Sequence, residues 1–246
     1  MSPGELWQQI KAQLGGHMPP IDAEGDRIVA EMGRLLMNED TDEQVRVEIA
    51  QRFVEWGRRR PKLYVGPLMV AASNTTSAQL CEVIAESQEA AVCASLAANP
   101  NIPENAQMRI VDELRPGWPH LITNPSTTAR ALERIAEKGR WIVMRIDILK
   151  HPNCPENVAE QIWEHQLGDH YIDYRMHRAM RAFLKRNPQA WAIQLSYNLH
   201  LAGVTPTPPP AQLENWMDEE QLRQAAELTK GGWAASLDEL LAVVRS

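Results

Sequence analysis

Apolar residues along the chain fall in short helical stretches that stop abruptly and restart after a few residues. In the segment "SLAANPNIPENAQMRIVDEL", one stretch is stopped by Asn99-Pro100 and a second opens at Pro103-Glu104. Proline disfavours helical backbone at the residue before it and lacks the amide donor that a continuing helix needs, whereas asparagine suits the end of a helix. Each stop therefore predicts two neighbouring helices joined by a short turn.

The same stop recurs roughly every 25 residues, a period typical of stacked helical repeats. The last residues before the five turns are Asn38, Ser73, Asn99, Asn124 and His151. Four residues after each comes an N-cap residue or a proline suited to a first helical turn: Asp42, Ser77, Pro103, Thr128 and Pro155. Eleven residues after each comes an isoleucine: Ile49, Ile84, Ile110, Ile135 and Ile162. Three residues before each comes an apolar residue: Leu35, Val70, Leu96, Leu121 and Ile148.

These columns predict an all-α chain built from two-helix repeats, in which the isoleucine and the earlier apolar residue face the interior. A single pair of helices is too small to bury both side chains, so neighbouring repeats must stack to form the core, as in an α-solenoid. Strand-like alternation of apolar and polar residues is nowhere sustained. A sixth, divergent repeat is predicted where "LKRNP" places another stop at Asn187-Pro188.

Four parts follow from this pattern. We predict an N-terminal helix and loop over residues 1–23, and the repeat array over 24–203. A proline-rich linker follows at 204–210, because its prolines favour extended backbone. Residues 211–246 form an acidic C-terminal hairpin, with one helix over 211–230 and a second after Gly231-Gly232.

Net charge, apolar content and cysteine spacing exclude or disfavour several classes of function. The net charge of −7 and pI near 5.6 argue against a protein whose main work is gripping a phosphate backbone. No leader pattern and no run of about 20 apolar residues is present, which predicts a cytoplasmic protein that does not span a membrane. The three cysteines are scattered, which predicts reduced thiols and no disulfide or metal cluster. No phosphate-binding loop or catalytic motif is visible, so no catalytic residue and no cofactor is predicted.

The repeats resemble those of the leucine-rich repeat variant family, which run Asn-Pro-x-Thr-Pro and then a Leu/Ile-Ala pair. The resemblance covers residues 63 to 165 closely and 24 to 62 loosely. The positions in register are Asn99-Pro100, Pro103, Ile110, Asn124-Pro125, Ile135-Ala136, Pro155 and Ile162. It implies a right-handed superhelix, close to HEAT-like solenoids, and no enzymatic activity. Some members carry an N-terminal iron-sulfur module ligated by cysteines, but residues 1–80 hold no cysteine, so that cofactor is not carried over.

One predicted helix carries a basic stripe, which we define as Arg175, Arg178, Arg181, Lys185 and Arg186. Helical geometry places these cations opposite an apolar face formed by Met176, Met180, Phe183 and Leu184. The stripe is the candidate docking surface for an acidic partner protein, or for nucleic acid. The alternative is an ordinary solvated face.

Other residues offer weaker candidates. On the same helix His170, Asp173, Tyr174 and His177 share a face that suits a metal, or else a helix-helix seam with a local Asp173–His177 pair. We favour the seam, because no metal motif accompanies these residues. A second basic cluster, Arg58, Arg59, Arg60 and Lys62, is explained by the preference of helix C-termini for cations. Four tryptophans lie in different registers of the repeat, and most of them are interpreted as core or seam fillers: Trp118, Trp141, Trp163 and Trp191.

The leading functional hypothesis is a non-enzymatic scaffold or adaptor that binds a partner protein through its extended surface. The alternative is a nucleic-acid-binding HEAT-like protein, similar to the HEAT-like glycosylases, that uses the helix over 175–186. A second alternative is a metal-dependent enzyme built around His170 and His177.

Overall fold

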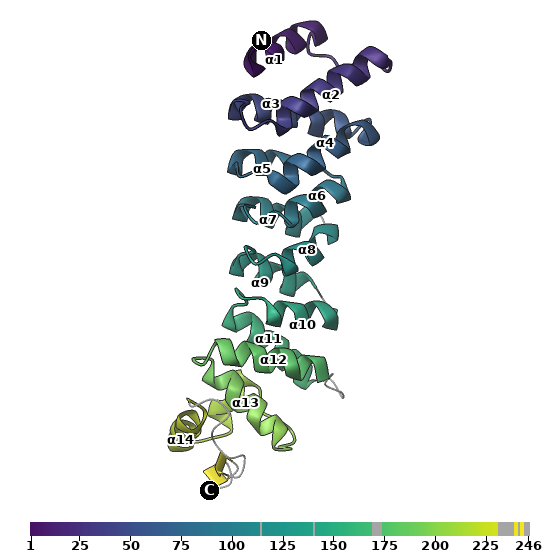
Figure 1. Ribbon diagram of the computed structural model, residues 1–246. Helices are drawn as coiled ribbons and strands as arrows, with labels where there is room; N and C mark the ends of the chain where they lie inside the picture. The colour runs from purple at the N-terminus through teal and green to yellow at the C-terminus, as the bar shows by residue number, and fades with distance from the viewer. Residues whose placement is uncertain (114, 140, 169–173, 231–238, 241, 244–246) are drawn as a thin grey trace. The chain divides into compact units, whose positions relative to one another are not determined.

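The computed structural model describes the chain apart from residues 114, 140, 169–173, 231–238, 241 and 244–246 (Figure 1). Every regular element in the described ranges is a helix, as the apolar pattern predicted. The chain divides into two compact units, Met1–Ile135 and Ala136–Ser246, which are described separately.

Helices of the first unit stack in two rows, with each helix touching the one two elements further along. One row contains α2, α4, α6 and α8, and the other contains α3, α5 and α7 (Figure 1). Helix α9 is tied to α7 by the exposed ion pairs Arg130–Glu104 at 3.2 Å and Arg134–Asp112 at 3.1 Å. The elements are α1 (Pro3–Leu14), α2 (Ala23–Met37), α3 (Glu43–Gly57), α4 (Pro61–Asn74), α5 (Ala78–Ile84), α6 (Ala90–Ala97), α7 (Glu104–Glu113), η1 (Arg115–Gly117), α8 (Trp118–Thr123) and α9 (Ala129–Lys138), within which the unit ends.

The predicted starts of the second helix in each repeat are confirmed. Asp42 and Ser77 are the N-cap residues of α3 and α5, and their side chains accept amide hydrogens from the first turn. Helix α7 begins directly after Pro103, and α9 directly after Thr128. The five isoleucines of the repeat are at most 3% exposed. Stacking of helix pairs therefore buries the column that the spacing assigned to the interior.

The residue that ends the first helix of a repeat also shapes the turn after it. The Oδ1 atoms of Asn38, Asn99 and Asn124 each accept the backbone N–H of the residue two positions later, at 2.8 to 3.0 Å. Thr75 does the same through Oγ1 at 3.1 Å, and His151 through Nδ1 at 3.0 Å. A short side-chain acceptor at this position turns the chain locally in place of a backbone hydrogen bond.

The other end of the amide ties one repeat to the preceding one. Asn99 Nδ2 donates to the carbonyls of Ala72 at 2.7 Å and Thr75 at 2.9 Å. Asn124 Nδ2 donates to the carbonyls of Ala97 at 2.9 Å and Asn99 at 2.8 Å. Both asparagines are buried, and these bonds supply donors to carbonyls at the ends of helices, where intrahelical partners run out. The Asn99 carbonyl also accepts the backbone N–H of Ile102 at 3.2 Å. We call this series of contacts the asparagine ladder.

One predicted boundary is wrong. Helix α4 does not stop at Ser73 but continues to Asn74, and Thr75 takes the ladder position. No proline follows Ser73, and Asn74 Nδ2 bonds back to the carbonyl of Val70 at 2.8 Å inside the helix. The register of α4 therefore differs from the prediction. Val70, expected in the interior, is 45% exposed.

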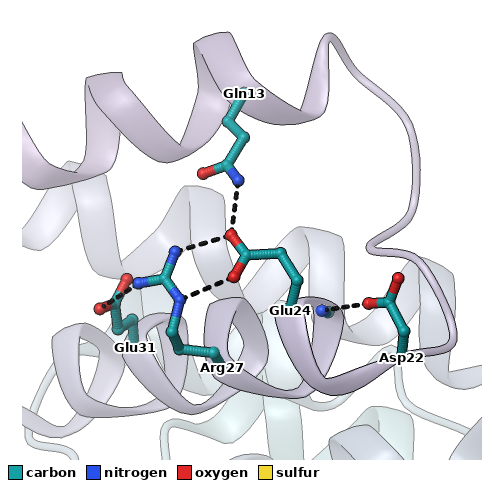
Figure 2. A network of polar contacts seen from close by, with 6 residues as sticks. Gln13, Asp22, Glu24, Arg27 and Glu31 are labelled. Atoms are coloured by element: carbon teal, nitrogen blue, oxygen red, sulfur yellow. Dashed lines mark hydrogen bonds and ion pairs between the residues drawn. The ribbon is translucent and has the colours of Figure 1, made fainter.

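The first helix docks through polar contacts at its rim. Trp7 is buried, and its Nε1 donates to Glu48 of α3 at 2.7 Å, while Lys11 pairs with the same carboxylate. Figure 2 shows a second network, in which Glu24 accepts from Gln13 of α1 and from Arg27. Hydrogen bonds from Arg27 and Gln13 lower the pKa of Glu24 to about 2. Because this network is exposed, it orients α1 against α2 more than it stabilises the unit.

The second unit contains two further helix pairs and the tail. Its elements are α10 (Ile142–Lys150), α11 (Glu156–Leu167), α12 (Tyr174–Arg186), α13 (Trp191–Leu201), η2 (Pro210–Asn215) and α14 (Glu219–Lys230). Helix α10 contacts α12, and α11 contacts α13. The predicted stop before Asn187-Pro188 is confirmed, since α12 ends at Arg186 and α13 begins four residues after Asn187.

The tail packs on α13. Pro208 accepts a hydrogen bond from Ser196 Oγ at 2.6 Å, and Leu213 is buried against Leu195 and Leu199. The helix predicted to begin at residue 211 begins instead at Glu219, because Asp218 caps it by accepting from Gln221 N at 2.8 Å. The proline-rich residues before it lead into η2.

The ladder predicts a specific cost for losing its donor. The variant Asn99→Asp keeps the acceptor of the turn but places an oxygen against the carbonyls of Ala72 and Thr75. We expect its unfolding free energy, measured by urea denaturation, to fall by at least about 1–3 kcal/mol, the cost of an unsatisfied buried polar group. Asn101→Ala, at an exposed position in the same turn, is the control and should change little. An equal loss in both variants would contradict the ladder's role.

Candidate functional site

Helix α12 presents the basic stripe on its solvent side. Arg175, Arg178, Arg181, Lys185 and Arg186 are all exposed. The apolar residues predicted to lie opposite them, Met176, Met180, Phe183 and Leu184, are at most 4% exposed. The helix is therefore amphipathic in the predicted register, with its cations outside.

Arg186 has a structural task that its residue type did not indicate. Its Nη2 donates to the carbonyls of Leu149 at 2.8 Å and His151 at 3.3 Å, both at the end of α10. These carbonyls correspond to those of Ala97 and Asn99, which Asn124 satisfies in the first unit. Arg186 thus performs the ladder function. The asparagine beside it, Asn187, bonds instead to Phe183 of its own helix at 2.9 Å.

Arg181 is also engaged with the protein. Its Nε donates to the hydroxyl of Tyr197 on α13 at 3.3 Å. The same hydroxyl lies 3.2 Å from His177 Nδ1 and donates to the carbonyl of His177 at 3.4 Å. Two of the five stripe residues therefore hold α12 against neighbouring helices. Arg175, Arg178 and Lys185 supply the rest of the exposed charge.

A cluster of aromatic side chains lies behind Arg181. The ring of His177 stacks on that of His200, with centroids 5.8 Å apart. Trp163 meets Tyr197 edge-on at 5.1 Å and His200 at 5.5 Å, and its Nε1 donates to Ser196 Oγ at 3.0 Å. The sequence did not predict that three of these residues belong to a site with His177: Trp163, Tyr197 and His200. They lie on α11 and α13 and share no motif or spacing with His177.

The electrostatics of this cluster favour neutral imidazoles. Burial lowers the pKa of His177, and His200 and Arg181 lower it further. Burial also lowers the pKa of His200 and raises that of Tyr197. No group of three or more His, Cys, Asp or Glu side chains in the described ranges is arranged to hold a metal. His170 and Asp173, which completed the metal face in the sequence analysis, lie outside the described residues.

The second basic cluster lies at the end of α3 and the start of α4. Arg58 and Arg59 are exposed just after α3, and Arg60 Nη1 donates to the carbonyl of Pro19 at 3.1 Å. The side chain of Lys62 lies outside the described part.

The prediction that most of the four tryptophans are core or seam fillers holds for two of them. Trp118 and Trp163 are buried. The other two are exposed, Trp141 at 75% and Trp191 at 38%. Trp141 is the residue before α10, and Trp191 is the first residue of α13, so both side chains lie where helices begin.

The cysteines are buried and carry free thiols, as predicted. Burial raises the pKa of Cys81 and Cys93 to about 11 and that of Cys154 to about 12. Their thiolates are therefore scarce at neutral pH. In the part of the chain that is described, no helix combines the length and the apolar character needed to cross a bilayer.

Comparisons with protein-family models, with curated proteins and with solved structures found no match for this chain. The functional interpretation therefore rests on the geometry described above.

Arg186 and its neighbour Lys185 allow a matched test of the ladder role. Arg186→Gln removes a charged donor from two carbonyls, and we expect the unfolding free energy to fall by about 1–2 kcal/mol. Lys185→Gln removes the same charge one residue away and should change it by less than about 0.5 kcal/mol. Urea denaturation of both variants measures the difference, and equal losses would show that Arg186 acts only through its charge.

The histidine pair predicts a pH dependence of stability. Because the folded-state pKa values of His177 and His200 lie below the ordinary value, the unfolded chain binds protons first as the pH falls below about 6.5. Unfolding free energy should therefore decrease from about pH 7.5 to about pH 5.

The double variant His177→Gln/His200→Gln should lower this dependence, measured by urea denaturation at several pH values. His120→Gln, at an exposed position of the first unit, controls for the loss of an imidazole. A pH dependence unchanged by the double variant would contradict the assignment.

Proposed function

We propose that the chain is a non-enzymatic helical-repeat scaffold that binds an acidic partner protein through the surface of α10 and α12. The architecture proposed is a right-handed α-solenoid of two-helix repeats, similar to the leucine-rich repeat variant family. The two-row stacking of the first unit and the asparagine ladder support this architecture. Rows of stacked helices offer extended surfaces that bind other macromolecules.

One observation carries the proposal: large exposed apolar side chains lie at the start of α12, which carries the basic stripe, and at the start of α10, which contacts it. Trp141 is 75%, Val143 52% and Tyr174 67% exposed. Arg186 joins the end of α12 to the end of α10, and the two helices contact each other. We therefore infer that the starts of both helices, with Trp141 and Tyr174, lie at one end of this surface.

Aromatic residues beside arginines suit a protein partner. Tryptophan, tyrosine and arginine supply most of the binding energy at protein interfaces, where aromatic rings are buried and guanidinium groups pair with carboxylates. Binding of a nucleic-acid backbone needs many cations that are available to phosphates. Because Arg181 and Arg186 already donate hydrogen bonds within the protein, the stripe suits nucleic acid less well. The net charge of −7 also opposes nucleic acid. An acidic protein segment with an apolar residue fits the surface best.

A matched pair of charge reversals tests the proposal. Arg178→Glu/Lys185→Glu alters the stripe, whereas Arg58→Glu/Arg59→Glu makes the same charge change at exposed positions of the first unit. We expect a partner protein captured by the unaltered chain to be retained by the control and lost by the stripe variant. Trp141→Ala should weaken capture by about tenfold or more, as for an interface hot spot.

Binding is then measured with the purified partner by calorimetry. Equal capture by the stripe variant and its control would overturn the proposal. Retention of duplex DNA that falls steeply with added salt and is lost in Arg178→Glu/Lys185→Glu would instead establish the nucleic-acid alternative.

A further inference from the structure

The asparagine ladder is interrupted at its first step. Thr75 stands where Asn99 and Asn124 stand in the next two repeats, and its hydroxyl is used to accept Ser77 N. Threonine has no amide group to reach back to α2. Within the described chain, no side chain donates to the carbonyls of Leu36 and Asn38, the counterparts of Ala97 and Asn99. The end of α2 therefore lacks the donor that the following repeats possess.

A cavity of about 570 Å³ opens at this interruption. It lies between the ends of α2 and α4, entirely within the first unit, and α3 and α5 contribute to its wall. Its lining includes apolar side chains from three helices, Leu36, Val70 and Leu80, together with the hydroxyl-bearing Thr75 and Thr76. The volume lies in the range of small-molecule sites.

Polar atoms without partners gather at the same turn. Arg46 lines the cavity, and its Nε is buried without a hydrogen-bond partner among the described residues. The buried Oγ1 of Thr41 also lacks one, whereas its counterpart Thr127 donates to the carbonyl of Leu121 at 2.6 Å. Buried donors are nearly always satisfied, by protein, water or ligand. Of the three buried side-chain atoms without a partner in the described chain, two thus belong to the turn after α2 and the first turn of α3, and the third is the hydroxyl of Tyr64 in α4.

The cavity holds groups of both signs. Arg46 is a cation, and a carboxylate is the partner that fits a guanidinium group best. Glu39 also lines the cavity and directly follows Asn38, whose carbonyl accepts the backbone N–H of Thr41 at 3.1 Å but no side-chain donor in the described chain. The C-terminal end of a helix attracts positive charge. An ammonium group is therefore favoured on the α2 side and a carboxylate on the Arg46 side.

We propose that this cavity binds a zwitterionic ligand of the α-amino-acid class. Its carboxylate pairs with Arg46, its ammonium group donates to the carbonyls at the end of α2 and pairs with Glu39, and its side chain lies against Leu36, Val70 and Leu80. A free amino acid and a short peptide with free termini share this chemistry. The site lies in the first unit and is independent of the surface proposed for a partner protein, so either proposal can fail alone.

Calorimetry with four probes tests the charge requirements. L-leucine should bind with one-to-one stoichiometry. N-acetyl-leucine lacks the ammonium group and leucinamide lacks the carboxylate, so each should bind at least about tenfold more weakly, as expected for a lost charged hydrogen bond. The dipeptide leucyl-leucine separates the two sources: tighter binding than leucine identifies a peptide, and weaker binding identifies the free amino acid.

Two variants assign the binding to this cavity. Arg46→Gln should weaken leucine binding by at least about tenfold, while Arg58→Gln, outside the cavity, should leave it unchanged. Thr75→Asn supplies the missing amide. It should raise the midpoint of thermal unfolding, because the ladder is completed, and weaken leucine binding by at least about tenfold, because the new amide occupies the α2 carbonyls to which the ammonium group donates.

Thermal unfolding of each variant establishes that it is folded. No binding of any probe to the unaltered chain at millimolar concentration would overturn the proposal, and the cavity would then hold water alone. Leucine binding that survives both Arg46→Gln and Thr75→Asn would overturn it too.

Discussion

A buried primary carboxamide at the end of a helix can serve two repeats at once. In Asn99 and Asn124 the oxygen accepts an amide of the next turn, and the nitrogen donates to two carbonyls of the preceding repeat. The first contact sets where the chain leaves one helix, and the second sets how closely successive helices approach. The burial of the isoleucine column depends on both, since the side chains mesh only if the repeats keep a constant spacing.

Substitutions at the ladder position change the local chemistry in different ways. His151 keeps the acceptor function through Nδ1. The carbonyls at the end of α10, that of His151 included, receive their donor from Arg186, while the neighbouring Asn187 bonds to Phe183. Thr75 keeps only the acceptor. At the end of α10 the donor is a guanidinium group at the end of α12. Beside α2, where Thr75 offers no donor, a cavity remains. The cationic surface and the cavity thus both coincide with positions where no asparagine amide donates to the preceding repeat.

Helix boundaries and the buried isoleucine column could be predicted because they depend on local chemistry and a short period. Asn-Pro pairs and N-cap residues act within one turn, which a sequence displays directly. The boundary after Ser73 failed because no proline follows it, and Asn74 bonds inside its own helix. An exposed Trp141 was missed for a related reason: a tryptophan at the start of a helix need not follow its apolar face.

The site was less predictable because its contacts join residues on different helices. The amphipathic register of α12 was evident from spacing, and its five cations are exposed. Nothing in the spacing showed that His177 would stack on His200, or that Arg181 would reach Tyr197. The sequence also gives no sign that Arg186, beside an asparagine, makes the hydrogen bond that a ladder amide makes elsewhere. Such substitutions between unlike residues become visible only when the carbonyls that they satisfy are compared.

The difference between an asparagine and an arginine donor also explains how Arg186 can be both a structural residue and an exposed cation. An asparagine amide is short and is buried once it reaches the preceding helix, so it leaves no charge at the surface. An arginine has a longer side chain and more donors, and Arg186 can use Nη2 internally while the group as a whole stays exposed. Replacing the ladder amide by a guanidinium group therefore keeps the contact with the preceding helix and adds charge to the surface. In this way the contacts that hold the repeats together also determine where charge is displayed.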